Sequence, residues 1–423
     1  MSLFTAAESE KIRSAFPELA AQVNGKPLVY LDSAATSLRP VSAVNAESEF
    51  ALNGTAAVNR GAHTLAALAT ERFEEARETI ASHFGARPAD FVFTSNATES
   101  INLVALAFRL ASAADGSGRF VLKPGDEIVL TEAEHHANLI PWQEVAKQTG
   151  AVLRFAKVTD AGELTVSAVS DVITDKTRVL AFTAASNVLG IRNPVSEISA
   201  IGRAAGALVL VDACQAAAHG SFDVKSSGAD FAVMSAHKMY GPTGIGGLWG
   251  DEKVLAEMPV VLTGGSMITR VEYDSSDYLP APSKFEPGTP RLTQAIGWVE
   301  SIRFVNAIGV DRIASHEKAL GELLYAGLTQ IPGVTVLGTN LGVERVGLVS
   351  FAVAGVHSHD VGQVLDSDGV AARVGHHCAQ PLHKRLGFDS STRFSLGAYS
   401  TERDVAVAID SLSRVRNFFG VTD

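Results

Sequence analysis

The chain has 423 residues, of which 46% are hydrophobic and 19% charged, and its formal net charge at pH 7 is -11. A chain of this size and composition can bury a large core, and an acidic chain without a Lys/Arg run lacks the basic patch expected of a nucleic-acid or anionic-membrane surface. The two cysteines, Cys214 and Cys378, lie far apart in the sequence, so we expect no disulfide framework and assign no metal.

The sequence opens without a basic region followed by an apolar leader, and no later apolar stretch is long enough to span a bilayer. We therefore expect a cytoplasmic protein with no membrane partner. The first predicted element is an amphipathic helix over residues 6–16, which ends at Pro17.

Short apolar or β-branched runs then alternate with helical segments. We predict strands over residues 126–131, 151–156, 178–183, 207–212, 231–234 and 246–249. Continuous apolarity is typical of strands that are covered on both faces. This pattern predicts a three-layer α/β domain with a mainly parallel sheet and crossover helices.

The pattern changes beyond residue 290. We predict helices to residue 309 and over 311–330, strands over 334–337 and 346–352, and a closing helix over 401–419. This order favours a smaller α+β domain. The predicted organisation is an N-terminal segment (1–25) that packs on the small domain, a large domain (26–290) and a small C-terminal domain (291–423).

Ligands of open α/β sheets bind at the carboxyl ends of strands, so polar residues that end apolar runs are candidates for a site. Asp212 ends one such run. A carboxylate there can keep a pyridine nitrogen protonated, although it can also simply cap the next helix. In residues 95–100 Thr98 is a plausible N-cap, and the helix start suits a phosphate, with an ordinary capped helix as the alternative.

Lys238 follows a short apolar strand and enters a Gly-rich turn. A lysine that forms a Schiff base must be partly desolvated, and pyridoxal phosphate is the obvious carbonyl partner. The alternative is an exposed turn lysine. His135, in the pair with His136 after another predicted strand, can stack on a flat cofactor or relay protons, although such a pair is usually structural.

Cys378 lies in a polar segment flanked by Gly375 and Pro381, typical of a loop. Imidazoles and a guanidinium nearby, such as Arg373, raise the thiolate fraction of a thiol, so we interpret Cys378 as reactive. Cys214 lies between alanines beside a core strand and is interpreted as a small hydrophobe.

Taken together, these segments resemble the class V group of fold type I pyridoxal-phosphate enzymes, and specifically the cysteine desulfurases of the sulfur-mobilisation (Suf) type. Matching segments run from residues 30–35 to 394–397 and include 59–65, 186–190, 264–268 and 285–290. The resemblance implies a fold type I PLP-dependent transferase and a homodimer with each active site at the subunit interface.

The resemblance also implies the roles of individual residues. Lys238 would carry the cofactor as an internal aldimine, His135 would stack on its ring, and Asp212 would pair with the pyridine nitrogen. The other members of the implied site are Gln215 on the ring hydroxyl; Thr98, Ser235 and His237 on the phosphate, with Ala97 also in the cofactor site; Thr289 on the phosphate from the partner subunit; and Asn187, Arg373 and Arg393 for the substrate, Arg393 gripping its carboxylate.

The implied activity converts L-cysteine to L-alanine. Lys238 would move the Cα proton, and Cys378 would take the sulfur as a persulfide and pass it to an acceptor of the SufU or SufE type for iron–sulfur cluster assembly. In the SufU branch a histidine of the small domain takes a place on the acceptor's zinc, and His359 is the candidate here. Asn59 departs from the family pattern, in which several members have histidine at that position.

Three other activities stay open. Selenocysteine lyase or cysteine sulfinate desulfinase activity would use the same scaffold, with L-selenocysteine or a sulfinate as substrate. A class V aminotransferase would consume a keto acid and would leave the loop around Cys378 unexplained. A catalytically silent scaffold is disfavoured because every residue that the chemistry needs is present.

Overall fold

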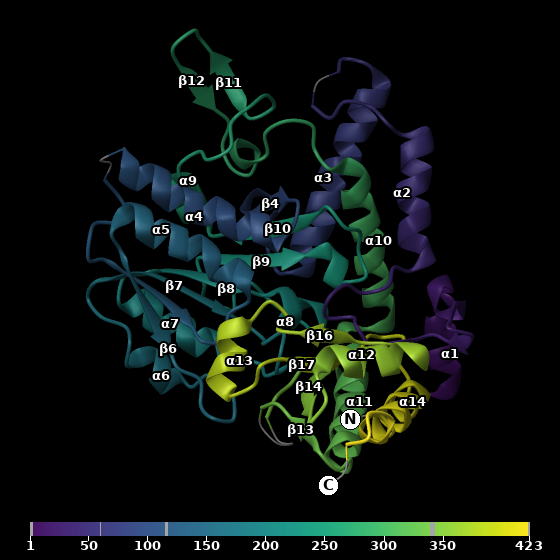
Figure 1. Ribbon diagram of the computed structural model, residues 1–423. Helices are drawn as coiled ribbons and strands as arrows, with labels where there is room; N and C mark the ends of the chain where they lie inside the picture. Colours follow the sequence, from purple (N-terminus) through teal and green to yellow (C-terminus); the bar gives the residue numbers. More distant parts are fainter. Residues whose placement is uncertain (1–2, 60, 115–116, 339–342, 422–423) are drawn as a thin grey trace.

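The computed structural model describes residues 3–59, 61–114, 117–338 and 343–421. Its centre is a seven-stranded sheet with the strand order β4-β10-β9-β8-β7-β5-β6 (Figure 1). The strands β5 to β9 are parallel, and β10 runs antiparallel to both β9 and β4. The bounds of these strands are β4 (Phe91–Thr94), β5 (Glu127–Thr131), β6 (Val152–Ala156), β7 (Thr177–Thr183), β8 (Leu208–Asp212), β9 (Phe231–Ser235) and β10 (Gly246–Gly250).

The central strands are buried on both faces, as their continuous apolarity predicts. In β8, Leu208 and Leu210 pack into the core beneath the helices α4 and α5, whereas Val209 and Val211 face the opposite core. This confirms the predicted α/β class with a mainly parallel sheet. The helices around the sheet are α2 (Val41–Asn53), α3 (Thr64–His83), α4 (Ala97–Ala113), α5 (Ile140–Thr149), α6 (Val166–Ser170), α7 (Val195–Ala204), α8 (Cys214–Ala218), α9 (Glu252–Glu257) and α10 (Leu292–Ile308).

All six predicted strands are present, each within about one residue of its expected bounds. The prediction missed β4, a strand of only four residues. Because β4 runs in the same direction as β5 to β9, the carboxyl ends of six strands meet at one edge of the sheet. Chain segments that follow Thr94, Thr131, Thr183, Asp212 and Ser235 are thereby brought together.

A second, four-stranded antiparallel sheet with the order β13-β14-β17-β16 lies beside the first. The leucines of α11, such as Leu320 and Leu324, pack on Phe351 and Phe394 of this sheet. Its elements and those near it are β3 (Val29–Tyr30), α11 (Val310–Thr329), β13 (Val334–Val336), β14 (Leu348–Val353), α12 (Ser358–Ser367), β15 (Val370–Ala371), β16 (Arg373–Gly375), α13 (Gln380–Leu386), β17 (Ser391–Ser395), α14 (Glu402–Ser413) and α15 (Val415–Phe418).

The N-terminal helix α1 (Ala6–Ser14) lies against the second sheet's helices (Figure 1). Phe4 donates its amide to His316 of α11 at 3.1 Å, and Arg13 forms an ion pair of 2.8 Å with Asp404 of α14. Helix α10 instead packs on α2 and α3, with Trp298 in the large core. We propose on these contacts the division into 1–25, 26–290 and 291–423, with α10 joining the two larger parts.

Three short strand pairs, one of them a projecting hairpin, complete the description of the sheets. β3 pairs in parallel with β15, which ties residues 29–30 to the C-terminal part of the chain. The remaining strands are β1 (Gln22–Val23) paired with β2 (Lys26–Pro27), and the hairpin β11 (Ile268–Val271) with β12 (Ser276–Tyr278), which projects from the body of the molecule (Figure 1).

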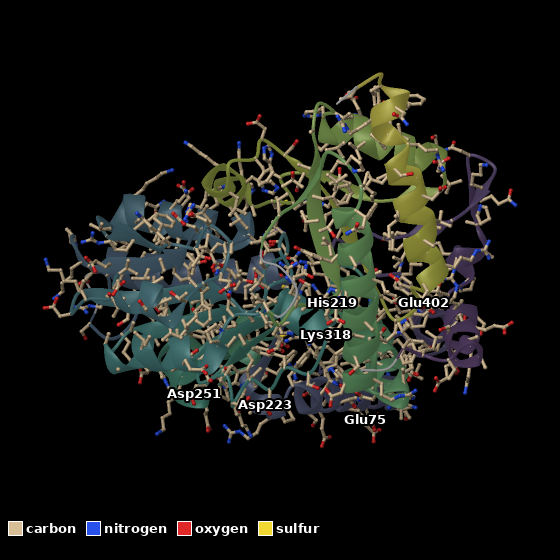
Figure 2. All side chains as sticks on the ribbon, turned by 90° about the horizontal axis from the view of Figure 1, so that it is seen from below. Glu75, His219, Asp223, Asp251, Lys318 and Glu402 are labelled. Carbon is tan, nitrogen blue, oxygen red and sulfur yellow. The ribbon has the colours of Figure 1, made fainter. Side chains whose placement is uncertain are left out.

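Charged side chains lie mainly at the surface, and apolar side chains fill the interior. Carboxylates such as Glu75, Asp223 and Asp251 lie at the periphery, whereas His219 lies among interior side chains (Figure 2). Within the described residues, no helix combines the length and the apolarity needed to cross a membrane.

Candidate active site

A cavity of about 390 Å³ opens at the edge of the large sheet where the strands end. Segments that follow β4, β5, β7, β8 and β9 contribute to its walls, together with segments from the second sheet. The predicted site residues that line this cavity are Ala97, Thr98, His135, Asn187, Asp212, Gln215, Ser235, His237, Lys238, Arg373 and Arg393.

Lys238 reaches the cavity from a tight turn after β9. The strand ends at Ser235, and a 3-10 turn over Ala236–Lys238 carries the half-buried lysine into the wall. A Cβ atom at Gly241 would lie 2.8 Å from the carbonyl oxygen of Ala236, so only glycine allows the chain to return this closely. The lysine is therefore held by backbone geometry rather than displayed on a free loop.

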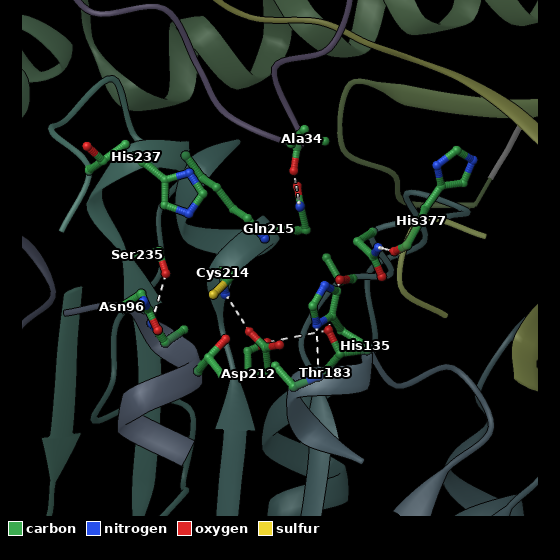
Figure 3. A pocket seen from close by; sticks show the side chains of 18 of the residues that line it. Ala34, Asn96, His135, Thr183, Asp212, Cys214, Gln215, Ser235, His237 and His377 are labelled. Carbon is green, nitrogen blue, oxygen red and sulfur yellow. Dashed lines mark hydrogen bonds between the residues drawn. The ribbon is translucent and has the colours of Figure 1, made fainter. Parts of the chain in front are cut away.

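The middle of the cavity presents a carboxylate and an amide (Figure 3). Asp212 ends β8 and accepts the amide of Cys214 through Oδ1 at 3.0 Å. Gln215 donates through Nε2 to the carbonyl oxygen of Ala34 at 2.9 Å, and its buried Oε1 has no partner among the described residues. Cys214 itself is buried, as predicted for a small hydrophobe, and burial raises the pKa of its thiol.

His135 lies at one end of the cavity (Figure 3). Its Nδ1 accepts the amide of Ala137 at 3.0 Å, which fixes the ring at the start of a 3-10 turn over His136–Asn138. Burial, followed by the positive charge of Lys238, lowers the pKa of His135 to about 4. The imidazole is therefore neutral at physiological pH, as a ring that stacks on a cofactor or accepts a proton must be.

The opposite end is built from the start of α4 and the end of β9 (Figure 3). The predicted cap at Thr98 is wrong, because Asn96 has the extended backbone of an N-cap and its side chain accepts the amide of Glu99 at 2.9 Å. Thr98 is already inside the helix. The amide of Ala97 donates to the Ser235 hydroxyl at 2.9 Å, which joins the helix start to the lysine-bearing strand.

His237 completes this end of the cavity. Burial, with a smaller effect from Lys238, lowers its pKa to about 4, so its imidazole is neutral. A neutral imidazole, a serine hydroxyl and a helix N-terminus together offer hydrogen-bond donors and a positive dipole end to an anion.

Arg393 projects from β17 into the cavity and is 1% exposed. Its guanidinium donates to the carbonyl oxygen of Asn187 at 2.8 Å and to Asp32 at 3.0 Å, and burial lowers its pKa to about 10. The group stays charged at neutral pH and its Nε has no partner among the described residues. Sequence reasoning assigned no role to Asp32, although this residue lies two positions after β3 in a matching segment.

Glu134 was also missed. It is buried behind the cavity wall, where its carboxylate accepts bonds from the Thr131 hydroxyl and the Asn138 amide, both at 2.6 Å. Burial raises the pKa of Glu134 to about 8, against the opposing effect of these bonds. The network fixes the turn that carries His135, and the only sequence signal for it was the position of Glu134 after a strand end.

The loop with Cys378 borders the cavity. His377 lines the cavity, whereas Cys378 is not among its lining residues; the Cys378 thiol lies 3.5 Å from Nη2 of the lining residue Arg373. Both His377 and Cys378 have left-handed backbones, with φ of 50° and 59°. Non-glycine residues rarely adopt this conformation. Other contacts must therefore hold the loop, among them the bond from the Asn187 side chain to the carbonyl oxygen of His377 at 2.6 Å.

Thr289 and His359 lie away from the cavity. Thr289 is exposed and lines a small separate hollow beside Glu99 and Arg291. This position leaves it free for the predicted contact with the cofactor phosphate of a partner subunit. His359 is exposed in the first turn of α12. Asn59, the departure from the family pattern, is exposed with a left-handed φ of 58°, a conformation that asparagine tolerates better than most residues.

The residues present fit pyridoxal 5′-phosphate. The unpartnered Oε1 of Gln215 can accept a ring hydroxyl, and the Asp212 carboxylate can pair with a protonated pyridine nitrogen. The end with Ser235, His237 and the start of α4 suits the phosphate, and Lys238 supplies an amine for the aldehyde. Each functional group of the cofactor would thus have a complementary group among the residues that line the cavity.

Comparisons with known proteins agree with this fit. The family model for aminotransferase class-V matches residues 29–407. The probable cysteine desulfurase of Streptomyces coelicolor is 46% identical over 98% of both chains, and the cysteine desulfurase of Dickeya dadantii is 41% identical over 97% of both.

Solved structures show the same fold over the whole chain. The apo cysteine desulfurase of Thermococcus onnurineus superposes with a TM-score of 0.90 at 35% identity and covers 99% of both chains. The Escherichia coli cysteine desulfurase CsdA (S-sulfonic acid) has a TM-score of 0.88 at 34% identity, covering 99% of this chain and 100% of that one. The chain therefore belongs to the aminotransferase class-V family of pyridoxal-phosphate enzymes, and within it to the cysteine desulfurases.

Proposed function

We propose that this enzyme converts L-cysteine to L-alanine and takes the sulfur onto Cys378 as a persulfide. The observation that carries the proposal is the position of the Cys378 loop. His377 of this loop lines the same cavity as Lys238 and Asp212, and the thiol contacts Arg373, itself a cavity residue. A class V aminotransferase would have no use for a thiol in this place.

Pyridoxal phosphate bound here supplies an electron sink for negative charge that develops beside the substrate's amino group. Asp212 keeps the pyridine nitrogen protonated, which strengthens that sink. Lys238 is the group placed to remove the Cα proton and return it, because its amine lies in the cavity wall. Arg393 binds the substrate carboxylate, with Asn187 and Arg373 beside it.

The sulfur transfer balances without an outside oxidant. The thiolate of Cys378 attacks the sulfur of the substrate, an S–S bond forms, and the bond between the substrate's Cβ and its sulfur breaks. The electron pair of that bond stays on carbon, which is reduced and takes up a proton to become the methyl group of alanine. The transferred sulfur is oxidised to the persulfide level.

The test compares two substrates of one variant. Cys378→Ser should abolish alanine formation from L-cysteine, because hydroxyl oxygen cannot accept the sulfur. It should spare release of sulfite from L-cysteine sulfinate, which needs no enzyme nucleophile. Full alanine formation from L-cysteine by the Cys378→Ser enzyme would overturn the proposal, and loss of both activities would point instead to a damaged cofactor site.

The sulfur acceptor and the cellular role belong to the same proposal. The resemblance to Suf-type enzymes supports delivery to an acceptor of the SufU or SufE type, in the cytoplasm, for iron–sulfur cluster assembly. His359 is exposed in the first turn of α12 and is our candidate for contact with the zinc of a SufU-type acceptor. If His359→Ala leaves acceptor-stimulated turnover unchanged, this contact is wrong.

A homodimer is the proposed working form. Thr289 is exposed and lies outside the cavity of its own chain, which supports its proposed contact with the phosphate of a partner subunit. The exposed leucines Leu65 and Leu68 of α3 line a hollow that residues of α2 and α10 complete, and α2 exposes a further leucine, Leu52, outside the hollow. Apolar side chains gathered in this way favour an isologous interface.

A further inference from the structure

The turn that carries Cys378 is fastened to the residue next to His135. The backbone amide of His136 donates to the carbonyl oxygen of Cys378 at 2.6 Å. The side chain of His136 accepts the amide of Gln380 through Nε2 at 3.1 Å. One residue therefore makes two contacts to the loop, at Cys378 itself and two residues after it. His136 lies in the large domain, whereas Cys378 lies in the small one.

The backbone amide of Gln380 has no hydrogen-bond acceptor within its own helix. Gln380 is the first residue of α13, and the N-cap residue Ala379 provides no side-chain bond. The first amides of a helix have no partner within the helix, so an outside acceptor stabilises the start. The imidazole of His136 is the acceptor for the Gln380 amide.

An imidazole nitrogen that accepts a hydrogen bond carries no proton, so His136 must be neutral in this arrangement. Its setting agrees with that requirement. The ring is half-buried, and burial, followed by the neighbouring His376, lowers its pKa.

The loop depends on stabilising contacts because its backbone conformation is energetically unfavourable. His377 and Cys378 are consecutive non-glycine residues in the left-handed region. Each such residue is disfavoured unless its surroundings hold it. Asn187 bonds the carbonyl oxygen of His377 between these two residues, and His136 bonds the carbonyl oxygen of Cys378 and the amide of Gln380 after them.

We propose that His136 is a positioning residue that holds Cys378 at the rim of the active-site cavity. The inference rests on the proposed function, since it gives the thiol a place from which to meet the substrate's sulfur. His136 does not itself contact the reacting atoms. Its neighbour His135 lines the cavity. The pair His135–His136 therefore connects the cofactor site to the loop that carries Cys378.

The test uses the holoenzyme with His136→Ala and with His136→Gln, whose side-chain oxygen can again accept the Gln380 amide. Three quantities are measured: the rate at which iodoacetamide alkylates Cys378, kcat and KM for L-cysteine, and the visible absorption of the cofactor. His357→Ala is the matched control, because His357 likewise accepts a helix-start amide, that of His359, at 3.2 Å and does not line the cavity.

For His136→Ala we expect faster alkylation and a lower kcat, each by about fivefold, the factor that one neutral hydrogen bond supplies. KM and the cofactor absorption should stay near the parent values. His136→Gln should recover most of both changes, and His357→Ala should resemble the parent enzyme when no acceptor protein is present.

Unchanged alkylation and kcat in His136→Ala would overturn the proposal. So would a His136→Gln enzyme as defective as His136→Ala, or loss of the cofactor absorption, which would place the effect in the cofactor site. If His136→Ala does not fold, hydrogen exchange of the parent enzyme decides, because a rapidly exchanging Gln380 amide contradicts the bond. Alkylation and exchange need no substrate, so they test the loop even if L-cysteine gives no alanine.

Discussion

At the scale of single residues, the chemistry depends on a lysine, a carboxylate and a thiol that come from three different segments. Lys238 follows β9, Asp212 ends β8, and Cys378 lies between β16 and α13. Each is placed by the end of a regular element rather than by a long loop. This placement makes the consequences of single substitutions specific.

Lys238→Ala should lose the visible absorption of the bound cofactor, because the Schiff base needs that amine. Alanine formation should fall by about 10²–10⁴-fold, since the same amine moves the Cα proton. Absorption spectra and an alanine assay check both effects. Lys284→Ala is the control, since Lys284 is a partly buried lysine that does not line the cavity. An absorption band that survives Lys238→Ala would contradict the assignment.

Arg393→Lys should raise KM for L-cysteine and leave the cofactor absorption intact. Lysine keeps the charge but cannot donate at once to the Asn187 carbonyl, Asp32 and a substrate carboxylate. A lost charge-assisted bond is worth about 1.5–3 kcal/mol, which is ~10–100-fold in binding. The comparison is the steady-state kinetics of Arg385→Lys, because Arg385 is a half-buried, ion-paired arginine that does not line the cavity. Equal KM values in the two variants would show that Arg393 does not hold the carboxylate.

At the scale of elements, the docking of the N-terminal segment depends on one tautomer of His316. Its Nε2 faces the carbonyl oxygen of Ser400 at 2.9 Å and must carry the proton, so Nδ1 is the bare nitrogen that accepts the amide of Phe4. Burial lowers the pKa of His316. Protonation of Nδ1 would remove the bond to Phe4.

Acid should therefore loosen the N-terminal segment. The pKa of His316 in the folded chain lies below the ordinary value of about 6.5. The stabilisation is thus complete above that value and is lost as the pH falls through the lower folded pKa. Hydrogen exchange of the peptide with Phe4, corrected for the intrinsic pH dependence, should show less protection on acidification. His316→Gln, which cannot titrate, should abolish the change, and the same loss in that variant would contradict the mechanism.

The sequence predicted elements well where local composition decides them. The continuous apolar run of residues 207–212 predicts both a buried strand and the position of Asp212 at its end. The choice of N-cap was wrong because Asn96 and Thr98 are both good capping residues only two positions apart, and the backbone entering α4 selects Asn96. The pair of Asp32 with Arg393 could not be predicted, because 361 residues separate the partners.

At the scale of the whole molecule, the proposed dimer makes a separate prediction. Leu65 and Leu68 of α3 are 55% and 50% exposed, and Leu52 of α2 is 82% exposed. The double variant Leu65→Glu/Leu68→Glu should sediment as a monomer, because charge is costly in an apolar interface. It should also lose activity, since Thr289 would no longer reach a partner's cofactor.

Leu323→Glu on α11 is the control for that experiment, because Leu323 is 43% exposed on a different helix. It should remain a dimer with unchanged turnover. A double variant that sediments as a dimer would place the interface elsewhere, and a fully active monomer would contradict the proposed role of Thr289.

The central claim is that the enzyme moves sulfur from the substrate to its own thiol. The most direct measurement is to mix the holoenzyme with L-cysteine in the absence of reductant, and to measure alanine together with the mass of the peptide that contains Cys378. We expect one alanine for each active site, with one added sulfur atom on that peptide. Alanine formed while the peptide keeps its original mass, or amino transfer that requires a keto acid, would contradict the account.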